Sequence, residues 1–537
     1  MPSVRTWLGV VTLPALLVAA AGAAAPAALA RSHAVRPAAA KGGTITDAFP
    51  IQPDTLNPAQ TGDTVAIQID RNIFDSLVYE TPQGTFQPWL ATGWKITDGG
   101  KTYTFQLRKG VTFQDGTPFN AQAMVFNVNY IRNPKTHSIG AVGALGPIVS
   151  ATATGPYTVV FRFKTPYAPF LTNLASPELG PQSPTAIKKW GSSYGDHIVG
   201  TGPFTLESYT SGTGFVLVRN PHYDWAPAAY GRNGPAYLSK ITYDFTTSPT
   251  VAQESLQTGE SQVLEGASTI AFKDLKSNPA YTAMYVPING AGVYAPMDVK
   301  TAPTNDLKVR QAILYAINRQ GVEDLADQGQ YQLTWGPIQK GTFGYDPKFN
   351  GMYSYNPKKA AQLLQSDGYK KVGGFWTKGG KKLTVQINLF AGGGDFDTYG
   401  TAIQGYLLKF GIDATTQTLE QSAWTSEQIA HKWNITPLQF SSVDPDVMRL
   451  EFGCGQYFDW IGFCNKQLDN LLNQGLATTN TAQRQAIYWK AETIVMDNAL
   501  VIPLRLDENL DLLSVKVKGV TDYIGGDLDF YNAYVSP

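Results

Sequence analysis

One serine lies in a pattern that could perform covalent chemistry. Gly191-Ser-Ser-Tyr-Gly195 has the Gly-x-Ser-x-Gly spacing of a hydrolase nucleophile, which would place Ser193 on a sharp turn between a strand and a helix. Here residues 186–190 indicate the end of a helix, and Pro203 follows soon afterwards. This context favours a loop. An exported serine hydrolase or peptidase using Ser193 is therefore the alternative hypothesis.

Three carboxylates lie close together further along the chain. Asp444, Asp446 and Glu451 could bind calcium, but their spacing lacks the glycine and the alternating ligands of an EF-hand loop. A turn with a capping aspartate is the favoured interpretation. The five histidines show no zinc-binding spacing, and we find neither a phosphate-binding loop nor a dinucleotide-binding turn. The sequence therefore predicts no catalytic residue, no metal and no cofactor.

The two cysteines, Cys454 and Cys464, are ten residues apart. An even number of cysteines and their close spacing favour a disulfide, as does the N-terminal export signal described below. Closing so short a loop would stabilise the fold by about 2–3 kcal/mol. A two-cysteine metal site is the alternative, but neither a second cysteine pair nor a nearby histidine supports it.

Composition excludes two broad classes of protein. Lys and Arg number 42, as do Asp and Glu, so the formal net charge is zero. A nucleic-acid binder needs a basic excess to neutralise phosphates, and we predict no such partner. Aromatic residues make up 12% of the chain, which argues against bulk disorder. Only 16% of residues are charged, which predicts a large, well-packed globular protein.

The N-terminus is typical of an export signal. Residues 1–30 contain one early cation, Arg5, then a Leu/Val/Ala stretch and the small-residue site Ala28-Leu-Ala30. An uncleaved membrane anchor is the alternative, because the apolar stretch is long enough to span a bilayer. No cysteine lies near this site, so we expect no lipid anchor there. Residues 31–40 are predicted to form a disordered tether, and the mature protein is expected outside the cytoplasm as a monomer.

Strand and helix patterns alternate along the rest of the chain, as in a mixed α/β protein. Alternating residues around Gly99-Gly100 and Gly155-Pro156 predict two hairpins, over 94–107 and 150–163. Other strands are expected over 43–49, 215–219, 241–245, 383–390, 412–418 and after residue 501. Helices are expected over 66–78, 120–130, 306–318, 357–368, 399–410, 466–477 and 481–497.

An ordered set of motifs identifies a family. The longest run spans residues 90–121, and shorter blocks precede and follow it in order: Leu56-Asn-Pro58, Ile73-Phe-Asp-Ser-Leu77, Val199-Gly-Thr-Gly-Pro-Phe204, Arg219-Asn-Pro-His-Tyr223, Val309 to Arg319, and Tyr355 to Leu364. This set resembles the solute-binding proteins of ABC transporters, family 5, which bind peptides, nickel or oligosaccharides. The resemblance covers about residues 41–537.

The resemblance implies a fold and a mechanism. It implies a two-lobe, type II periplasmic-binding-protein fold with an additional third domain. Lobe I would comprise residues 41–81, 200–290 and 505–537, the extra domain 82–199, and lobe II 291–504. Such a receptor is not an enzyme. It captures an oligopeptide or similar small organic solute between the lobes by hinge closure and delivers it to an ABC permease complex in the membrane.

The chain departs from the dipeptide-binding pattern at both anchor positions. Those relatives hold the peptide amine with an Asp where this chain has Ser441, unless the alignment shifts and makes Asp444 the anchor. They hold the carboxylate with an Arg in a loop that is short and lacks Arg here, residues 392–397. A buried charge without a partner is costly. We therefore expect a charge-poor, aromatic cleft and a solute more neutral or apolar than a free dipeptide. The alternatives are a longer ligand with exposed ends, or binding charges that come from elsewhere in the chain.

The candidate ligand contacts are Gln52, Trp335, Trp424, Phe440, Ser441, Asp444 and Trp460. A signalling receptor or a chaperone-like scavenger on the same fold is a further hypothesis, which the sequence alone leaves open.

Overall fold

The computed structural model describes residues 42–391, 396–456, 458–523 and 525–537. The predicted signal segment and tether lie outside the described residues, as does most of the loop 392–397. Among the described helices, none is long and apolar enough to cross a membrane.

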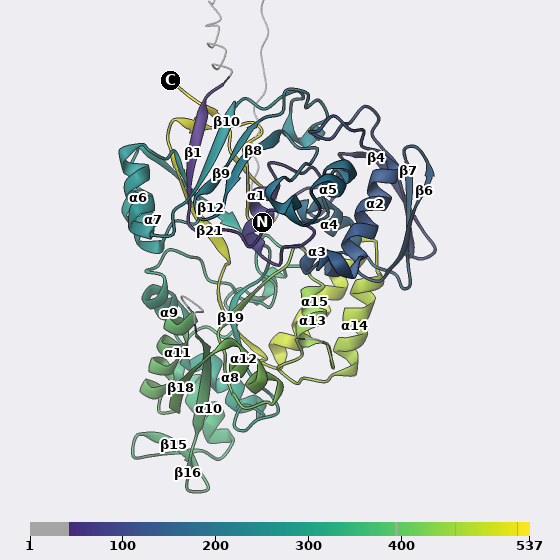
Figure 1. Ribbon diagram of the computed structural model, residues 1–537. Coiled ribbons are helices and arrows are strands. Elements are labelled where there is room, and N and C mark those ends of the chain that lie inside the picture. Colours follow the sequence, from purple (N-terminus) through teal and green to yellow (C-terminus); the bar gives the residue numbers. More distant parts are fainter. Residues whose placement is uncertain (1–41, 392–395, 457, 524) are drawn as a thin grey trace, which may run out of the picture. The chain divides into compact units, whose positions relative to one another are not determined.

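A seven-stranded sheet unites the start, the middle and the end of the chain (Figure 1). Its order is β12-β21-β11-β1-β10-β9-β8, and β1 pairs in parallel with both β10 and β11. The strands are β1 (Thr44–Phe49), β8 (Phe204–Thr210), β9 (Gly214–Arg219), β10 (Lys240–Phe245), β11 (Val263–Leu264), β12 (Tyr281–Pro287) and β21 (Glu508–Ser514). All seven fall within the three segments predicted for lobe I. The domain boundaries themselves stay a prediction.

Both faces of this sheet are covered. Side chains alternate along β1, so Ile45 and Phe49 enter one buried cluster and Ala48 enters another. The Ala48 side packs against α6 (Pro249–Thr258) and α7 (Thr269–Leu275), which lie next to the sheet in Figure 1.

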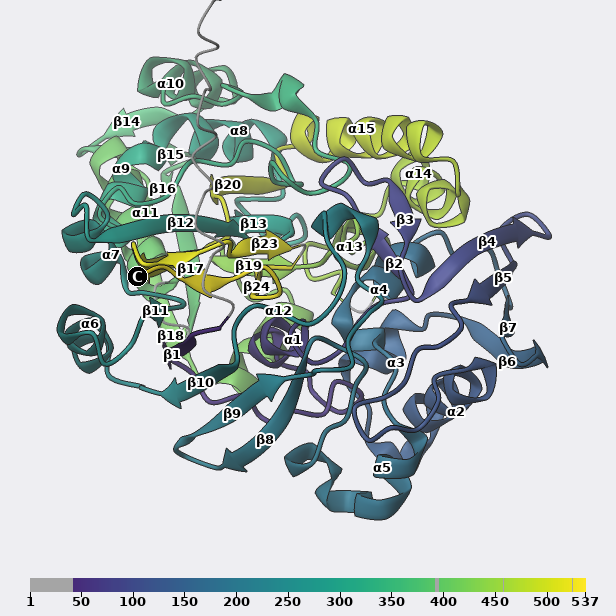
Figure 2. The same ribbon diagram turned by 90° about the horizontal axis from the view of Figure 1, so that it is seen from above.

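A second sheet, ordered β4-β5-β7-β6, contains the two predicted hairpins and confirms them (Figure 2). Its strands are β4 (Ala91–Thr97), β5 (Thr102–Leu107), β6 (Ile148–Gly155) and β7 (Thr158–Phe163). Helix α2 (Ala121–Arg132) packs on it, and the Asn120 side chain accepts a hydrogen bond from the Ala123 N–H, as expected of a cap. Tyr103 and Phe105 share one buried face and contact Phe170 of α4 (Phe170–Ala175).

Short helical segments adjoin the strands of this sheet in the sequence. Helix α3 (Gly140–Ala144) precedes β6, and after β7 and α4 come the 3₁₀ turn η2 (Pro177–Leu179), α5 (Pro184–Trp190) and the 3₁₀ turn η3 (Gly191–Asp196). Buried residues from both sheets form one continuous apolar cluster. The four-stranded sheet of the predicted extra domain and the seven-stranded sheet therefore share a core.

A separate apolar cluster extends from Ala291 to Leu504. Its strands are β13 (Gly290–Pro296), β19 (Leu438–Ser441) and β20 (Val501–Arg505) in one sheet, and β17 (Thr384–Phe390) with β18 (Asp413–Leu419) in a parallel pair. A small hairpin sheet holds β14 (Lys370–Val372), β15 (Phe375–Lys378) and β16 (Lys381–Lys382). The helices are α8 (Leu307–Ala316), α9 (Arg319–Ala326), α10 (Pro357–Ser366), α11 (Phe396–Phe410), α12 (Gln421–Ile429), α13 (Val447–Phe452), α14 (Lys466–Ala477) and α15 (Thr481–Asp497).

One predicted helix is wrong in extent. The pattern over 66–78 indicates a single helix, but α1 (Thr64–Asp70) is short, and strand β2 (Val78–Glu80) begins where the helix was expected to end. The Ile73 carbonyl instead accepts hydrogen bonds from the Gly202 N–H, at 2.8 Å, and from the Gln114 amide, at 3.0 Å. A Cβ on Gly200 would lie 2.2 Å from that carbonyl oxygen. The motif over residues 199–204 and the run over residues 90–121 thus both contact the Ile73 carbonyl, and the helix ends before this residue.

Candidate ligand-binding site

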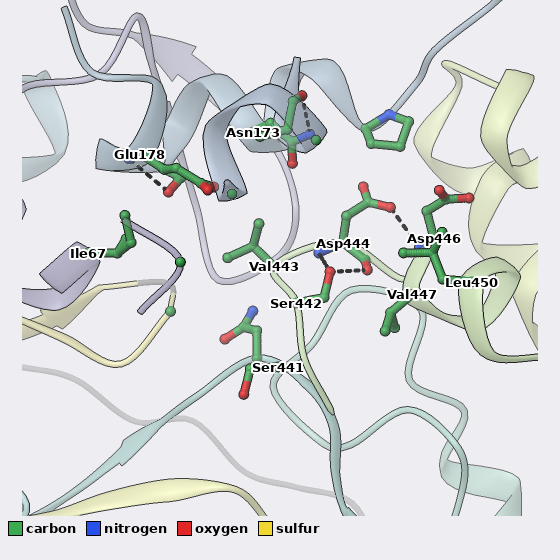
Figure 3. A pocket seen from close by; sticks show the side chains of 18 of the residues that line it. Ile67, Asn173, Glu178, Ser441, Ser442, Val443, Asp444, Asp446, Val447 and Leu450 are labelled. Carbon is green, nitrogen blue, oxygen red and sulfur yellow. Dashed lines mark hydrogen bonds between the residues drawn. The ribbon is translucent and has the colours of Figure 1, made fainter. Parts of the chain in front are cut away.

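A cavity of about 310 Å³ lies where distant segments of the chain meet (Figure 3). It is lined from the α1, α3, α4 and η2 side, from the segment joining β12 to β13, and from the segment that follows β19. The lining residues are Thr61, Gly62, Asp63, Ile67, Gly140, Gly143, Ala144, Tyr167, Pro169, Asn173, Ser176, Glu178, Ile288, Asn289, Ser441, Ser442, Val443, Asp444, Asp446, Val447, Leu450 and Gly525. A volume of this size suits a small organic ligand.

Two of the carboxylates lining this cavity are already neutralised by arginines. Arg484 of α15 donates to both oxygens of Asp444, at 2.6 and 2.7 Å, and both side chains are buried. Arg449 of α13 holds Asp446 in the same two-pronged way, at 2.7 and 2.9 Å. Burial raises the pKa of Asp446 to about 6, and the bonds from Arg449 oppose this shift. Asp444 and Asp446 are therefore each paired with an arginine of the protein itself.

The Asp444 oxygen also accepts a hydrogen bond from the Asp446 N–H, at 2.8 Å. This is the turn with a capping aspartate that the sequence favoured over a calcium loop. Glu451 points elsewhere, since it accepts a hydrogen bond from the buried Tyr294 hydroxyl.

Two further carboxylates face the cavity from the opposite side. Asp63 caps α1 by accepting a hydrogen bond from the Val65 N–H at 3.0 Å, and burial raises its pKa. Glu178 lies in η2, and burial raises its pKa to about 7. Among the described residues that line the cavity there is no Lys, Arg or His.

The expectation of a charge-poor, aromatic cleft is wrong for this cavity. Four carboxylates face it, and Tyr167 is the one aromatic residue among the described lining residues. Whole-chain composition averages over a surface far larger than one cavity, so it carries no information about the local charge.

Three of the predicted contact residues come together beside the cavity. Phe440, Trp424 and Trp460 belong to one half-buried aromatic cluster, in which Trp424 and Trp460 meet edge-to-face with ring centroids 5.2 Å apart. Phe458 joins Phe440 to Trp460 through centroid distances of 4.7 and 5.3 Å. The cluster flanks β19, whose last residue, Ser441, lines the cavity.

The cluster also includes Phe390, which packs on Trp424 at 6.0 Å. Neither Phe390 nor Phe458 was among the predicted contacts. Phe458 lies two residues before Trp460, between the two cysteines, and Phe390 ends the predicted strand over 383–390. Both residues could therefore have been predicted as candidate contacts from their positions in the sequence.

Two other predicted residues lie elsewhere in the structure. Gln52 bonds to the turn between β8 and β9, where its amide donates to Ser211 and its carbonyl accepts from the Gly212 N–H. Trp335 lies under the Arg319 guanidinium, 4.3 Å from the ring centroid, and lines a different hollow. Ser441 donates to the Asp507 carboxylate at 3.2 Å. The role of these residues in binding stays a prediction.

Most of the residues that line the cavity were not predicted, among them the polar residues Asp63, Asn289 and Glu178. Glu178 follows the Ser176-Pro177 start of a 3₁₀ turn, where Ser176 accepts a hydrogen bond from the Glu178 N–H. Acidic residues are common in the first turn of a helix, because a negative charge there interacts favourably with the helix dipole. Nothing in the local sequence could have marked it as a lining residue.

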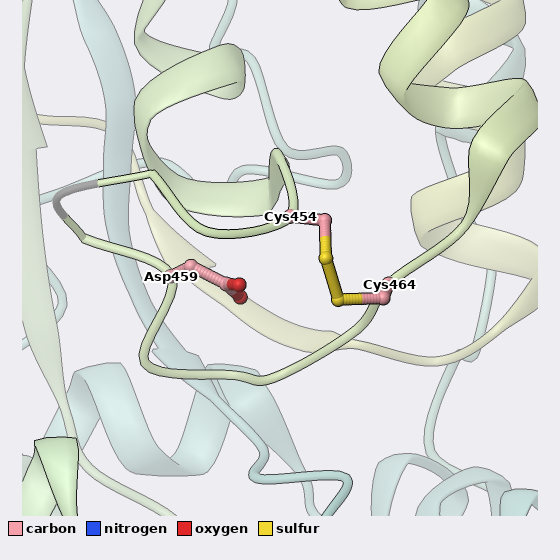
Figure 4. A group of neighbouring side chains, drawn as sticks. All are labelled: Cys454, Asp459 and Cys464. Atoms are coloured by element: carbon pink, nitrogen blue, oxygen red, sulfur yellow. A yellow bond between two sulfur atoms is a disulfide. The ribbon is translucent and has the colours of Figure 1, made fainter.

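The cysteine pair, Cys454 and Cys464, is drawn in Figure 4. Phe458 and Trp460 lie between these two cysteines in the sequence. The Cα atoms of Cys454 and Cys464 are 4.7 Å apart and the sulfurs are within bonding distance. Asp459 lies next to them, but its oxygens accept hydrogen bonds from the Gly455 and Gly462 N–H groups. Sulfurs joined to each other offer no thiolate, so this grouping does not favour the alternative metal site.

Comparison with known proteins identifies the class of protein to which this chain belongs. The family model of the bacterial extracellular solute-binding proteins, family 5 (middle), matches residues 85–451, and the chain belongs to that family. Members are extracytoplasmic receptors that bind peptides or other small solutes and work with ABC permeases. This protein is accordingly a solute-binding receptor of an ABC importer and not an enzyme.

Individual relatives are similar over nearly the full length. The glutathione-binding protein GsiB of Shigella flexneri is 27% identical over 505 residues, which cover 87% of this chain and 89% of that relative. The structure of NikA from Brucella suis with Fe(III)-EDTA superposes with a TM-score of 0.79 at 23% identity, covering 92% of this chain and all of that one. DppA from Helicobacter pylori with the peptide STSA gives 0.71 at 23% identity, covering 92% and 98%. These likenesses confirm the predicted two-lobe α/β fold class.

The hydrolase hypothesis is not supported. Ser193 is exposed within η3, which directly follows helix α5 rather than a strand. A hollow of about 600 Å³ lies beside Trp190 and His197, but Ser193 is not among the residues that line it. The Gly-x-Ser-x-Gly match is therefore a turn after a helix.

Proposed function

We propose that this protein captures an oligopeptide or a similar small organic solute in the cavity described above and delivers it to a membrane permease by hinge closure. The observation that carries the proposal is that the lining comes jointly from the two sides of the fold. Asp63 and Glu178 belong to one side, and Ser441 and Asp444 to the other. A ligand that touches both sides stabilises the closed arrangement relative to an open one.

The names of the relatives support a peptide-like ligand. GsiB is a glutathione-binding protein, and DppA from Helicobacter pylori was solved with a peptide. NikA from Brucella suis was solved with a metal chelate instead, so the fold also accepts other solutes.

The surroundings of the protein belong to the same proposal. Residues 1–30 direct export of the chain from the cytoplasm. Outside the cytoplasm, Cys454 and Cys464 stay oxidised. The receptor acts as a monomer and binds no nucleic acid.

A binding panel tests the ligand class. The mature protein is stripped of bound solute by unfolding and refolding, then mixed with glutathione, the tetrapeptide Ser-Thr-Ser-Ala or Fe(III)-EDTA, and its unfolding temperature is measured. The proposal predicts a rise with the peptides, because a ligand that binds only the folded state stabilises it. A rise with Fe(III)-EDTA alone would contradict the peptide class.

A further inference from the structure

The charges around the cavity do not balance. Four carboxylates line it, and arginines behind the cavity wall neutralise only Asp444 and Asp446. Asp63 and Glu178 lie on the other side, and no Lys, Arg or His lines the cavity among the described residues. An anionic or neutral solute would leave this imbalance in place, whereas a cationic group would remove it.

The turn fixes the Glu178 backbone, and its carboxylate lies against the start of α3. Ser176 accepts a hydrogen bond from the Glu178 N–H and starts the turn. Gly140, at the start of α3, leaves room for the side chain, since a Cβ there would lie 2.2 Å from Glu178 Oε1. Only glycine fits at residue 140 while the carboxylate keeps this position.

The charged groups near Glu178 do not supply a cation. Asp63 caps α1 and Asp70 ends it, and Glu178 contributes to the raised pKa of Asp70, so the neighbours on α1 are acidic. The next residue, Arg71, is directed elsewhere. It donates to Ser76 and to the Ala175 carbonyl, at 3.0 and 2.7 Å. Helices α3 and α4, which also pack on η2, carry no charged residue.

We propose that Glu178 is the counter-ion for a protonated amine of the solute, so the cavity selects ligands that carry an ammonium group. This inference rests on the proposed function, because it assigns a ligand contact within the same cavity. Asp63 reinforces the negative potential on that side. The amine is thus held from the extra domain, not from the lobe II segment where the sequence shows Ser441.

Binding of an amine should depend on pH. Burial raises the pKa of Glu178 to about 7, so the carboxyl is largely neutral at pH 6 and charged at pH 8. An ammonium group binds the charged form. Affinity is therefore expected to fall as the pH drops below about 7.

Four tripeptides that differ only in their end charges test this assignment. They are trialanine, its N-acetylated form, its C-terminal amide and the form blocked at both ends. Each is titrated calorimetrically at pH 8, alongside putrescine as an amine without a peptide backbone. The proteins are the stripped wild type, Glu178→Gln, Glu178→Asp and Glu254→Gln, the last being an exposed control on α6.

The two peptides with a free amine should bind about tenfold to a hundredfold more tightly than their acetylated forms, the range expected for a charge-assisted hydrogen bond. Glu178→Gln should abolish that preference, Glu178→Asp should keep part of it, and Glu254→Gln should keep all of it. The unfolding temperature of each variant confirms that it is folded.

Other results would overturn the inference. Equal binding of free and acetylated peptides by the wild type would do so, as would an amine preference that survives in Glu178→Gln. If putrescine binds through Glu178 but no peptide binds, the amine site stands and the peptide class fails. If the wild type binds none of the five probes, the amine site is contradicted.

Discussion

At the scale of single residues, Glu178 combines a binding role with a cost in stability. Its folded-state pKa of about 7 lies above the unfolded value of about 4.5, so the unfolded chain loses its proton first as pH rises. Stability therefore falls between about pH 4.5 and 7 and stays lower above that range. We predict that Glu178→Gln unfolds at a higher temperature than the wild type at pH 8 and at nearly the same temperature at pH 4. A lower unfolding temperature at pH 8 would show that the carboxylate stabilises the empty protein.

The Asp444–Arg484 pair gives the second prediction at this scale. Arg484→Met should lower the free energy of unfolding by about 3–5 kcal/mol, because it leaves the Asp444 carboxylate buried without a cation. Arg449→Met is the matched control, since the Arg449 side chain is 20% exposed against 6% for Arg484 and should cost less. Urea unfolding at pH 7 measures both. Equal losses would mean that burial does not decide the strength of these pairs.

At the scale of elements, helix α11 contains two glycines in opposite environments. A Cβ at Gly405 meets nothing within 4 Å, whereas one at Gly400 would lie 2.1 Å from Leu389 Cδ2 of β17. We predict that Gly405→Ala stabilises the protein by about 0.5–1 kcal/mol through helix propensity. Gly400→Ala should destabilise it by about 1–3 kcal/mol through overpacking. Thermal unfolding checks both signs, and a stabilising Gly400→Ala would show that β17 moves away freely.

Local signals predicted many elements well. Helices α14 and α15 begin and end at the expected residues, and both hairpins pair around the predicted turns. The helix expected over 66–78 failed because its end is fixed by Gly202 and Gln114, which are far away in the sequence. Several helices were not predicted, among them α6, α7, α9, α12 and α13.

The candidate site was predicted only in part, for the same physical reason. Ser441 and Asp444 line the cavity, and Phe440, Trp424 and Trp460 gather beside it. Glu178 and Asp63 could not be found, because their place at the cavity depends on how η2 and α1 pack against segments hundreds of residues away. Asp444 was predicted as a possible ligand anchor. Its pairing with Arg484 could not be predicted, because Arg484 lies 40 residues further along the chain.

At the scale of the whole molecule, the cavity draws its walls from residues 61 to 525. No single segment holds a ligand, so binding energy is available only when the two sides meet around it. The low charge content describes the chain as a whole. Four of the described residues that line the cavity carry carboxylates, which is why we expect a solute with an ammonium group.

Native mass spectrometry of the stripped receptor, after exposure to a tryptic digest, tests whether this cavity is the ligand site. Gly143 lines the cavity and a Cβ there meets nothing within 4 Å, so Gly143→Phe should fill the cavity without disturbing the fold. Gly405→Phe is the control outside it. We predict one retained amine-bearing peptide per wild-type or Gly405→Phe chain and none on Gly143→Phe. Retention of the same peptide by folded Gly143→Phe would contradict the assignment of this cavity as the ligand site.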